Sequence, residues 1–533
     1  MSQGRSTPAR VLMLGIDAAD PALLRAWATD GTLPNVARLL RTGLSGDTQS
    51  VEGFFVGSTW PSLYTGVNPA RHGLHYLTQL KPGTYETYQP AREAFVKHPP
   101  FWSLLSRAGK RVAIIDVPLT KLDPSINGLQ IVDWGGHDAV FGYQAWPPDL
   151  DVKLPPGGPD GHLCDAYRTG AAEYERFVEH LIHRVESRAE LTRNLLRRGD
   201  WDLFIQVFSE SHCAGHQCWH LHDVLLPTHD AAVAAVTGDP IRRVYQAIDS
   251  AIGRILEEAG DGLVLLISAH GMSHWFGACF LLPRILIRLG ITVPNLPPPS
   301  SVERPYAWRT VARRIWRRLP TSLKTRLAPL RQRLSGERLD PLAVKPLGVD
   351  AAKSLCFAVQ NGLATGGIRL NLKGREPHGL VAPGAEADAL CERIVASLLA
   401  IVDQKTGQPI VARVRRTADL YQGEHLGDLP DLLVDWNDRT PVGSAHVNGG
   451  AAASVTIQSP EIGVMEGTND FSRTGEHRIG GIFIAAGPGI RPGTMNRTIS
   501  NLDLAPTIAR VLGVELPGVD GRPILELESA VLP

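Results

Sequence analysis

The sequence predicts an α/β fold with a mostly parallel central sheet sandwiched between helices. Short continuous apolar segments, typical of strands buried on both faces, alternate along most of the chain with segments of helical periodicity. This alternation favours parallel strands joined by helices that cover both faces of the sheet. With 533 residues, the chain can also bury a large core without disulfide bonds or a structural metal.

The predicted elements follow one another along the chain. The predicted strands are apolar and rich in β-branched residues, and they lie at 11–16, 111–117, 203–208, 263–268, 432–436 and 482–486. The predicted helices carry apolar residues three and four positions apart, and they lie at 21–40, 101–108 and 244–256. Reactive residues gather at the carboxyl ends of parallel strands. Asp17, Glu210 and His270 each follow such an end, so we expect them at one edge of the sheet.

One segment, 286–344, departs from this alternation. It contains a proline-rich stretch and then, between 304 and 338, many basic residues interleaved with Trp and Leu. We interpret it as a basic helical cap inserted into a single catalytic domain formed by 10–285 and 345–525. The cap either packs its aromatic face on that domain, closes over an anionic substrate, or touches an anionic membrane surface peripherally through 304–338.

Composition narrows the class of protein. The 54 Lys and Arg residues balance the 54 Asp and Glu residues, so no nucleic acid binding is expected. The six cysteines are scattered without a CxxC pair and are interpreted as reduced thiols. Apolar segments stay well short of the ~18–20 residues of a membrane span, and the first ten residues are polar. We therefore expect a cytoplasmic protein.

Side chains suited to metal binding follow the predicted strands. His212 and His216 are four positions apart and share one face if their segment is helical, an arrangement that can clamp a metal. A chance surface cluster is the alternative for these histidines. Asp17 and Thr59 have the alternative of helix capping, although a hydroxyl at Thr59 could also act as a nucleophile.

Several motifs occur in a characteristic order. They are Gly15-Ile16-Asp17, 33–43, Ser58-Thr59-Trp60-Pro61, 65–73, Gly475-Glu476-His477 with 481–490, and 501–523. In this order the chain resembles the alkaline phosphatase superfamily, and within it the type I phosphodiesterase/nucleotide pyrophosphatase group. Segments 368–376 and 429–432 are similar to its cytosolic phosphohydrolase/phosphomutase-like members. The resemblance spans about 10–525 apart from the cap.

The resemblance implies a phosphodiesterase-like, metal-dependent phosphoric ester hydrolase that acts on a small phosphorylated substrate. It implies that Thr59 is the nucleophile and that a phospho-threonine intermediate forms. It places one metal on His212, His216 and His477. It places a second metal on Asp17, Thr59 and His270. Zn²⁺ is the expected metal, as one or two ions, with Mn²⁺ as an alternative. Asn68 and His137 are weaker candidates for substrate binding.

The chain departs from the family pattern at two positions. His212 stands where the family usually has Asp, a mild change because imidazole is a good Zn²⁺ ligand. Ala269 also stands where the family has Asp, and it supplies no ligand. Either Glu210 substitutes for the missing carboxylate, or one metal suffices, or the pocket is inactive. The alternatives to a phosphodiesterase are a degenerate member that binds a phosphorylated glycan or lipid, a phosphomonoesterase, and a phosphomutase.

Overall fold

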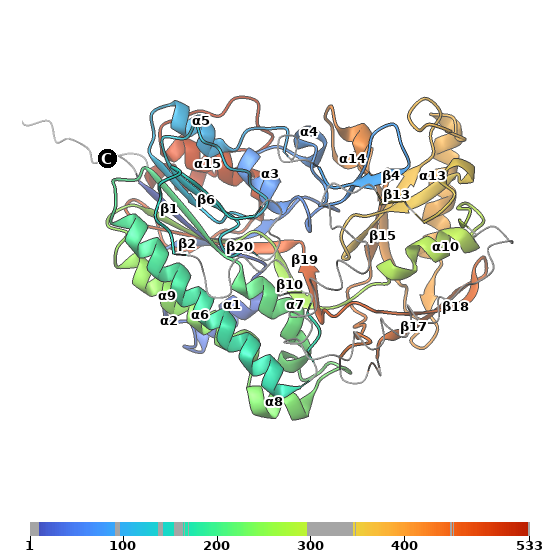
Figure 1. Ribbon diagram of the computed structural model, residues 1–533, viewed down its shortest axis with the longest axis horizontal. Coiled ribbons are helices and arrows are strands. Elements are labelled where there is room, and N and C mark those ends of the chain that lie inside the picture. Colours follow the sequence, from blue (N-terminus) through green and yellow to red (C-terminus); the bar gives the residue numbers. More distant parts are fainter. Residues whose placement is uncertain are drawn as a thin grey trace, which may run out of the picture.

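The computed structural model describes residues 10–90, 96–136, 142–153, 164, 166–168, 170–295, 345–346, 348–447, 450 and 452–530. His137 and the basic segment 304–338 lie outside these residues. The predictions about them, and about the cap as a whole, therefore stay predictions. Figure 1 shows a helix-covered sheet with a smaller group of sheets and helices beside it.

Among the described residues, a ten-stranded mixed sheet and the helices that cover it form the larger group of elements (Figure 1). Its order is β21-β2-β20-β9-β1-β8-β5-β6-β7, and β22 pairs with β2. The inner strands β9, β1, β8, β5 and β6 are parallel, whereas β20 and β7 run antiparallel to their neighbours. The bounds are β1 (Val11–Ile16), β2 (Leu44–Gln49), β5 (Val112–Ile115), β6 (Gly128–Val132), β7 (Gln144–Trp146), β8 (Leu203–Phe208), β9 (Leu263–Ser268), β20 (Gly480–Ala486), β21 (Gly493–Thr494) and β22 (Ile499–Ser500).

Helices cover both faces of this sheet, which confirms the predicted fold class (Figure 1). Along β1, Leu12 and Leu14 face one hydrophobic core while Val11 and Met13 face the other, as the two-residue period of a strand requires. One face carries α1 (Pro21–Thr29), α2 (Pro34–Thr42), α6 (Ala171–Leu196), α7 (Glu210–His222), α8 (Ala231–Thr237) and α9 (Pro240–Leu256). The other carries α3 (Thr59–Thr65), α5 (Phe101–Arg107) and α15 (Leu504–Val511).

A second group of elements has its own core. An antiparallel sheet of order β12-β13-β16-β15 and a three-stranded sheet β14-β17-β18 pack with α10 and α13. The bounds are α10 (Leu282–Arg288), β12 (Cys356–Val359), β13 (Thr365–Leu370), α13 (Ala385–Leu399), β14 (Val402–Asp403), β15 (Val411–Arg416), β16 (Leu432–Trp436), β17 (Ser454–Ser459) and β18 (Gly463–Thr468). Shorter elements are α4 (Pro69–His72), β3 (Gln79–Leu80), β4 (Glu86–Tyr88), β11 (Lys345–Pro346) and α14 (Thr417–Leu420).

Two element predictions need correction. The strand predicted at 432–436 exists as β16, but it lies in the antiparallel sheet and not in the central one. The helix predicted at 21–40 is two helices, because Gly31 adopts a positive φ and Pro34 begins a new helix. Among the described residues, no helix combines the length and apolar character needed to cross a membrane.

A separate two-stranded antiparallel sheet lies just beyond the carboxyl end of β9. Strand β10 (Gly271–His274) directly follows β9, and it pairs antiparallel with β19 (Gly475–Arg478). In this register Met272 lies opposite His477. Helix α7 begins just after the carboxyl end of β8 and contacts both β10 and β19. The helix and this strand pair therefore meet beyond the carboxyl edge of the central sheet.

Candidate metal centre

Three imidazole rings converge beyond the carboxyl edge of the central sheet. His212 and His216 come from consecutive turns of α7, and His477 comes from β19. The Nε2 atoms lie 3.0 Å apart for His212 and His216, and 3.1 Å from each of them to His477. All three side chains are buried. Three nitrogens held on a tetrahedral Zn²⁺ at ~2.0–2.1 Å would be about 3.3 Å apart, so this cluster fits such an ion.

Glycine lets helix α7 approach strand β19 closely enough to form the cluster. A Cβ atom on Gly475 would lie 2.3 Å from the carbonyl oxygen of Gly215. On the other side of the contact, a Cβ atom on Gly215 would lie 2.7 Å from Cγ of Met272. The backbone approach is secured by the amide of Thr474, which donates to the carbonyl oxygen of His216 at 2.6 Å.

Hydrogen bonds behind the rings orient them. His216 Nδ1 lies 2.8 Å from the carbonyl oxygen of Gly475 and must donate to it, so the Nε2 lone pair of the neutral ring faces the cluster. His212 Nδ1 lies 3.8 Å from Sγ of the buried Cys164. The nitrogen and sulfur atoms of Cys164, His212 and Cys213 form a second group within 4.8 Å of one another.

Asp17 and His270 lie beside the three histidines. Asp17 follows β1, and its Oδ1 accepts a hydrogen bond of 2.7 Å from the indole Nε1 of Trp60. The same oxygen is 3.9 Å from His270 Nδ1. The His270 ring in turn lies 4.6 Å, between centroids, from the His477 ring. Two residues predicted for the second metal therefore adjoin the first cluster.

Thr59 begins helix α3 and precedes Trp60, which contacts Asp17. Its side chain is buried, and its hydroxyl donates to the carbonyl oxygen of Phe55 at 2.6 Å. The Ser50 hydroxyl lies 2.5 Å from Thr59 Oγ1. Attack on a substrate would require the Thr59 hydroxyl to leave its bond to Phe55.

The position of the missing family carboxylate is fully enclosed. Ala269 is buried, and its carbonyl oxygen accepts a hydrogen bond from Nδ2 of Asn501. The Oδ1 atom of Asn501 is also buried and has no hydrogen-bond partner among the described residues. This amide is the polar group that the structure brings to Ala269.

Glu210 is engaged in a buried ion pair. Its Oε1 accepts hydrogen bonds from Arg188 at 3.1 and 3.2 Å, and Arg188 also donates to Asp116 at 2.7 Å. All three side chains are buried. This pairing gives Glu210 a structural role at the start of α7, whereas its buried Oε2 has no hydrogen-bond partner among the described residues, so its role as a substitute metal ligand stays a prediction.

Asn68 is engaged in helix capping. Its Oδ1 accepts from the amide of Ala70 at the start of α4, and its Nδ2 donates to Asp520 at 2.7 Å. These contacts account for the polar atoms of a side chain that the sequence suggested for substrate binding. Trp60, Asn501 and Arg473 were not singled out as site residues from the sequence, because their contacts depend on segments far apart in the chain.

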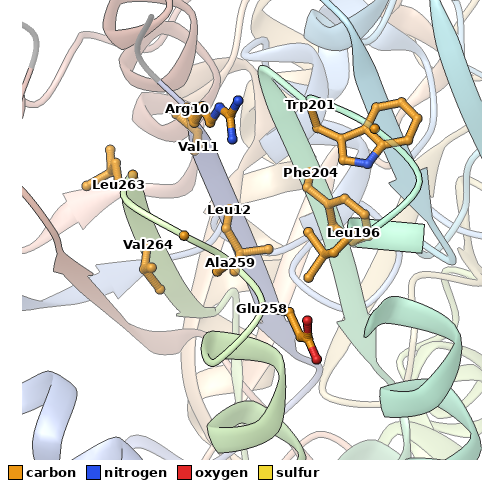
Figure 2. Close-up of a pocket in the computed structure, with 13 residues that line it drawn as sticks. Arg10, Val11, Leu12, Leu196, Trp201, Phe204, Glu258, Ala259, Leu263 and Val264 are labelled. Atoms are coloured by element: carbon orange, nitrogen blue, oxygen red, sulfur yellow. The ribbon is translucent and has the colours of Figure 1, made fainter. Parts of the chain in front are cut away.

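Two cavities lie at different places relative to the three histidines and Thr59. A cavity of about 60 Å³ lies at the amino ends of β1 and β9, lined by residues that include Arg10, Trp201 and Leu263 (Figure 2). It is at the opposite end of the strands from the histidines. A larger cavity of about 320 Å³ is lined by Ser50, whose hydroxyl contacts Thr59, and by Glu52 and Tyr421 among others.

The sequence of this chain matches a known family. The family model of the type I phosphodiesterases/nucleotide pyrophosphatases matches residues 11–283, just over half of the chain. The chain belongs to this family. It is a phosphohydrolase of the alkaline phosphatase superfamily, whose members use divalent metals. No curated protein sequence matches it closely enough to count as a relative.

The chain aligns over nearly its whole length with several solved structures. A mutant of the alkaline phosphatase PafA has a TM-score of 0.50 at 13% identity, covering 98% of this chain and 99% of that one. Human ectonucleotide pyrophosphatase/phosphodiesterase 5 has a TM-score of 0.47 at 10% identity, covering 98% and 99%. Phosphonoacetate hydrolase from Sinorhizobium meliloti 1021, in complex with phosphonoformate, has a TM-score of 0.46 at 15% identity, covering 94% of each chain.

Proposed function

We propose that this family member hydrolyses phosphoric esters, with a phosphodiesterase-like preference, through Thr59 as nucleophile and a phospho-threonine intermediate. The observation that carries the proposal is the convergence of the Nε2 atoms of His212, His216 and His477 at 3.0–3.1 Å. Neutral imidazoles so arranged bring three lone pairs together, an arrangement that a divalent cation stabilises. Zn²⁺ is the ion that this donor set suits best.

Each side chain then has a defined task. His212, His216 and His477 would hold the ion, which when bound supplies charge stabilisation to a phosphoryl group. Thr59 Oγ1 attacks phosphorus while the leaving oxygen departs on the opposite side, and water later hydrolyses the phospho-threonine. Asp17 and His270 are the polar side chains positioned to orient this chemistry, with Trp60 holding the Asp17 carboxylate. The cavity lined by Ser50 offers room for substrate on the Thr59 side.

The experiment compares hydrolysis of bis-p-nitrophenyl phosphate by the wild-type protein and the T59A variant, with Zn²⁺ or Mn²⁺ added. We expect metal-dependent activity that T59A lowers by at least ~10³-fold, since removing a nucleophile leaves only binding and electrostatic contributions. The matched control is T65A in the same helix, whose hydroxyl bonds the carbonyl oxygen of Pro61. Equal rates for wild type and T59A would refute the nucleophile assignment.

A degenerate member that binds a phosphorylated glycan or lipid without cleaving it is the second candidate. Ala269 favours it, because a buried methyl group stands where the family has a carboxylate. The two candidates separate in one measurement with mono- and diester substrates. Tight binding of phosphate to the metal-loaded protein without hydrolysis of either ester would support the degenerate member.

A further inference from the structure

Arg473 lies against the histidine cluster. It is two residues before β19, is half-buried, and its Nη1 lies 3.1 Å from Nε2 of His216. Guanidinium groups stay protonated and donate hydrogen bonds but cannot accept them. The guanidinium therefore donates to the Nε2 lone pair of His216, and it must release that lone pair when an ion binds, which leaves a permanent cation beside the candidate metal centre.

The backbone next to Arg473 is held firmly in place. The amide of Thr474 donates to the carbonyl oxygen of His216 at 2.6 Å, and its hydroxyl lies 3.2 Å from the same oxygen. The hydroxyl is also 3.3 Å from His220 Nδ1. Three contacts of one residue with helix α7 thus fix the point from which the Arg473 side chain extends toward the cluster.

Charge points to the kind of ligand that this arrangement suits. An arginine and a divalent cation a few ångströms apart repel each other, and in a partly buried site the repulsion is weakly screened. The repulsion turns into attraction when an anion lies between them with oxygen atoms facing both. A phosphoryl group has several such oxygens, and the planar guanidinium matches their spacing with paired hydrogen bonds.

We propose that Arg473 binds the oxygens of the phosphoryl group at the histidine centre and strengthens the binding of phosphoryl ligands there. Inorganic phosphate is the simplest such ligand. The inference rests on the proposed function, since it assumes a cation on His212, His216 and His477. It adds a phosphoryl-binding residue that the family motifs in the sequence did not identify.

The experiment measures calorimetric binding of inorganic phosphate at pH 8 to the Zn²⁺-loaded protein, and separately measures Zn²⁺ affinity of the metal-free protein. The variants are R473Q and R473K. The matched control is R497Q, because Arg497 is exposed and paired with Glu526 at the surface. We expect R473Q to weaken phosphate binding roughly 10- to 100-fold, as loss of a charge-assisted hydrogen bond does. R473K should recover part of that loss, and R497Q should match wild type.

Zn²⁺ affinity separates a ligand-binding role from a structural one. Removing a cation beside the ligand nitrogen should leave Zn²⁺ affinity unchanged or raise it, whereas loss of local structure would lower it. Unchanged phosphate affinity in R473Q, or a parallel loss of phosphate and Zn²⁺ affinity, would overturn the inference. If the wild-type protein binds no Zn²⁺ at the histidines, the proposed function fails first. If it binds Zn²⁺ but no phosphate, only the assignment of Arg473 fails.

Discussion

His216 and Gly475 join helix α7 to strand β19 through one hydrogen bond, from Nδ1 of the ring to the carbonyl oxygen at 2.8 Å. This bond selects the tautomer of His216 and directs its Nε2 toward His212 and His477. The glycine also permits the close approach on which the bond depends. The same contact therefore orients the candidate metal ligand His216 and packs strand β19 against helix α7.

We expect the G475A variant to lose stability and metal binding together. Its Cβ atom would lie 2.3 Å from the carbonyl oxygen of Gly215, and backbone atoms on both sides leave little freedom to move. The expected cost is about 1–3 kcal/mol of unfolding free energy, measured by urea denaturation. G215A is the control, since its Cβ would meet the flexible side chain of Met272. Equal Zn²⁺ affinities in the two variants would contradict this explanation.

Substitution of His477 tests whether the three rings share an ion. We expect H477A to lower Zn²⁺ affinity at least ~100-fold. Loss of a residue that only hydrogen-bonds to a metal ligand can lower metal affinity by up to ~100-fold, and loss of the ligand itself should lower it by no less. Competition with a chromogenic chelator gives the affinity. His378 is exposed and stacks on Tyr85, so H378A serves as the control. A zinc affinity unaltered in H477A would show that the cluster is not a metal site.

The sequence predicted part of this site well. The four-residue spacing of His212 and His216 predicted a shared helix face, and α7 confirms the helix. His477 entered only through the resemblance, because nothing local relates it to residues more than 250 positions earlier. Its approach depends on the pairing of β19 with β10, which places it opposite Met272.

Other features could not be predicted because their contacts are long-range. Glu210 was predicted as a possible metal ligand, and the sequence did not reveal that Arg188, from helix α6, pairs with both Glu210 and Asp116 in the interior. Segment 432–436 was assigned to the central sheet because buried strands of parallel and antiparallel sheets have the same apolar composition. The antiparallel sheet around it was not predicted as a unit.

The A269D variant should bind a second metal ion. We expect one Zn²⁺ per wild-type chain, because Ala269 supplies no ligand and Glu210 is paired with Arg188. An aspartate at 269 would add the carboxylate that the family carries beside Asp17 and His270. Metal analysis by mass spectrometry should then give about two ions per chain. A269N, which has the shape without the charge, should stay at one. Two ions in the wild-type protein would contradict the expectation.

The E210Q variant tests the buried ion pair. Arg188 would lose one of its two carboxylate partners and keep Asp116, so the protein should lose about 3 kcal/mol of unfolding free energy. Zn²⁺ content should not change, since the structure assigns Glu210 to Arg188. E257Q, at the exposed end of α9, is the control for a glutamate substitution. A loss of Zn²⁺ with little loss of stability would instead make Glu210 a metal ligand.

Acid should destabilise the protein through buried histidines outside the metal centre. His72 is fully buried, its Nδ1 accepts from the amide of Leu74, and its Nε2 lies 2.9 Å from the Ser62 hydroxyl. Burial, with a smaller effect from His98, lowers the pKa of His72 to about 3. The unfolded chain, with a pKa near 6.5, therefore takes up a proton first as the pH falls.

The contribution of neutral His72 to the free energy of unfolding is fully present above pH ~6.5 and is lost progressively as the pH falls toward ~3. At pH 5 the loss from this residue should be about 2 kcal/mol relative to pH 7.5. The H72N variant keeps an acceptor for the Leu74 amide but does not titrate. Its unfolding free energy should be lower at every pH, but the difference between pH 7.5 and pH 5 should shrink by about 2 kcal/mol. Parallel pH profiles of the wild-type protein and H72N would contradict the assignment, because the proton uptake would then come from other groups.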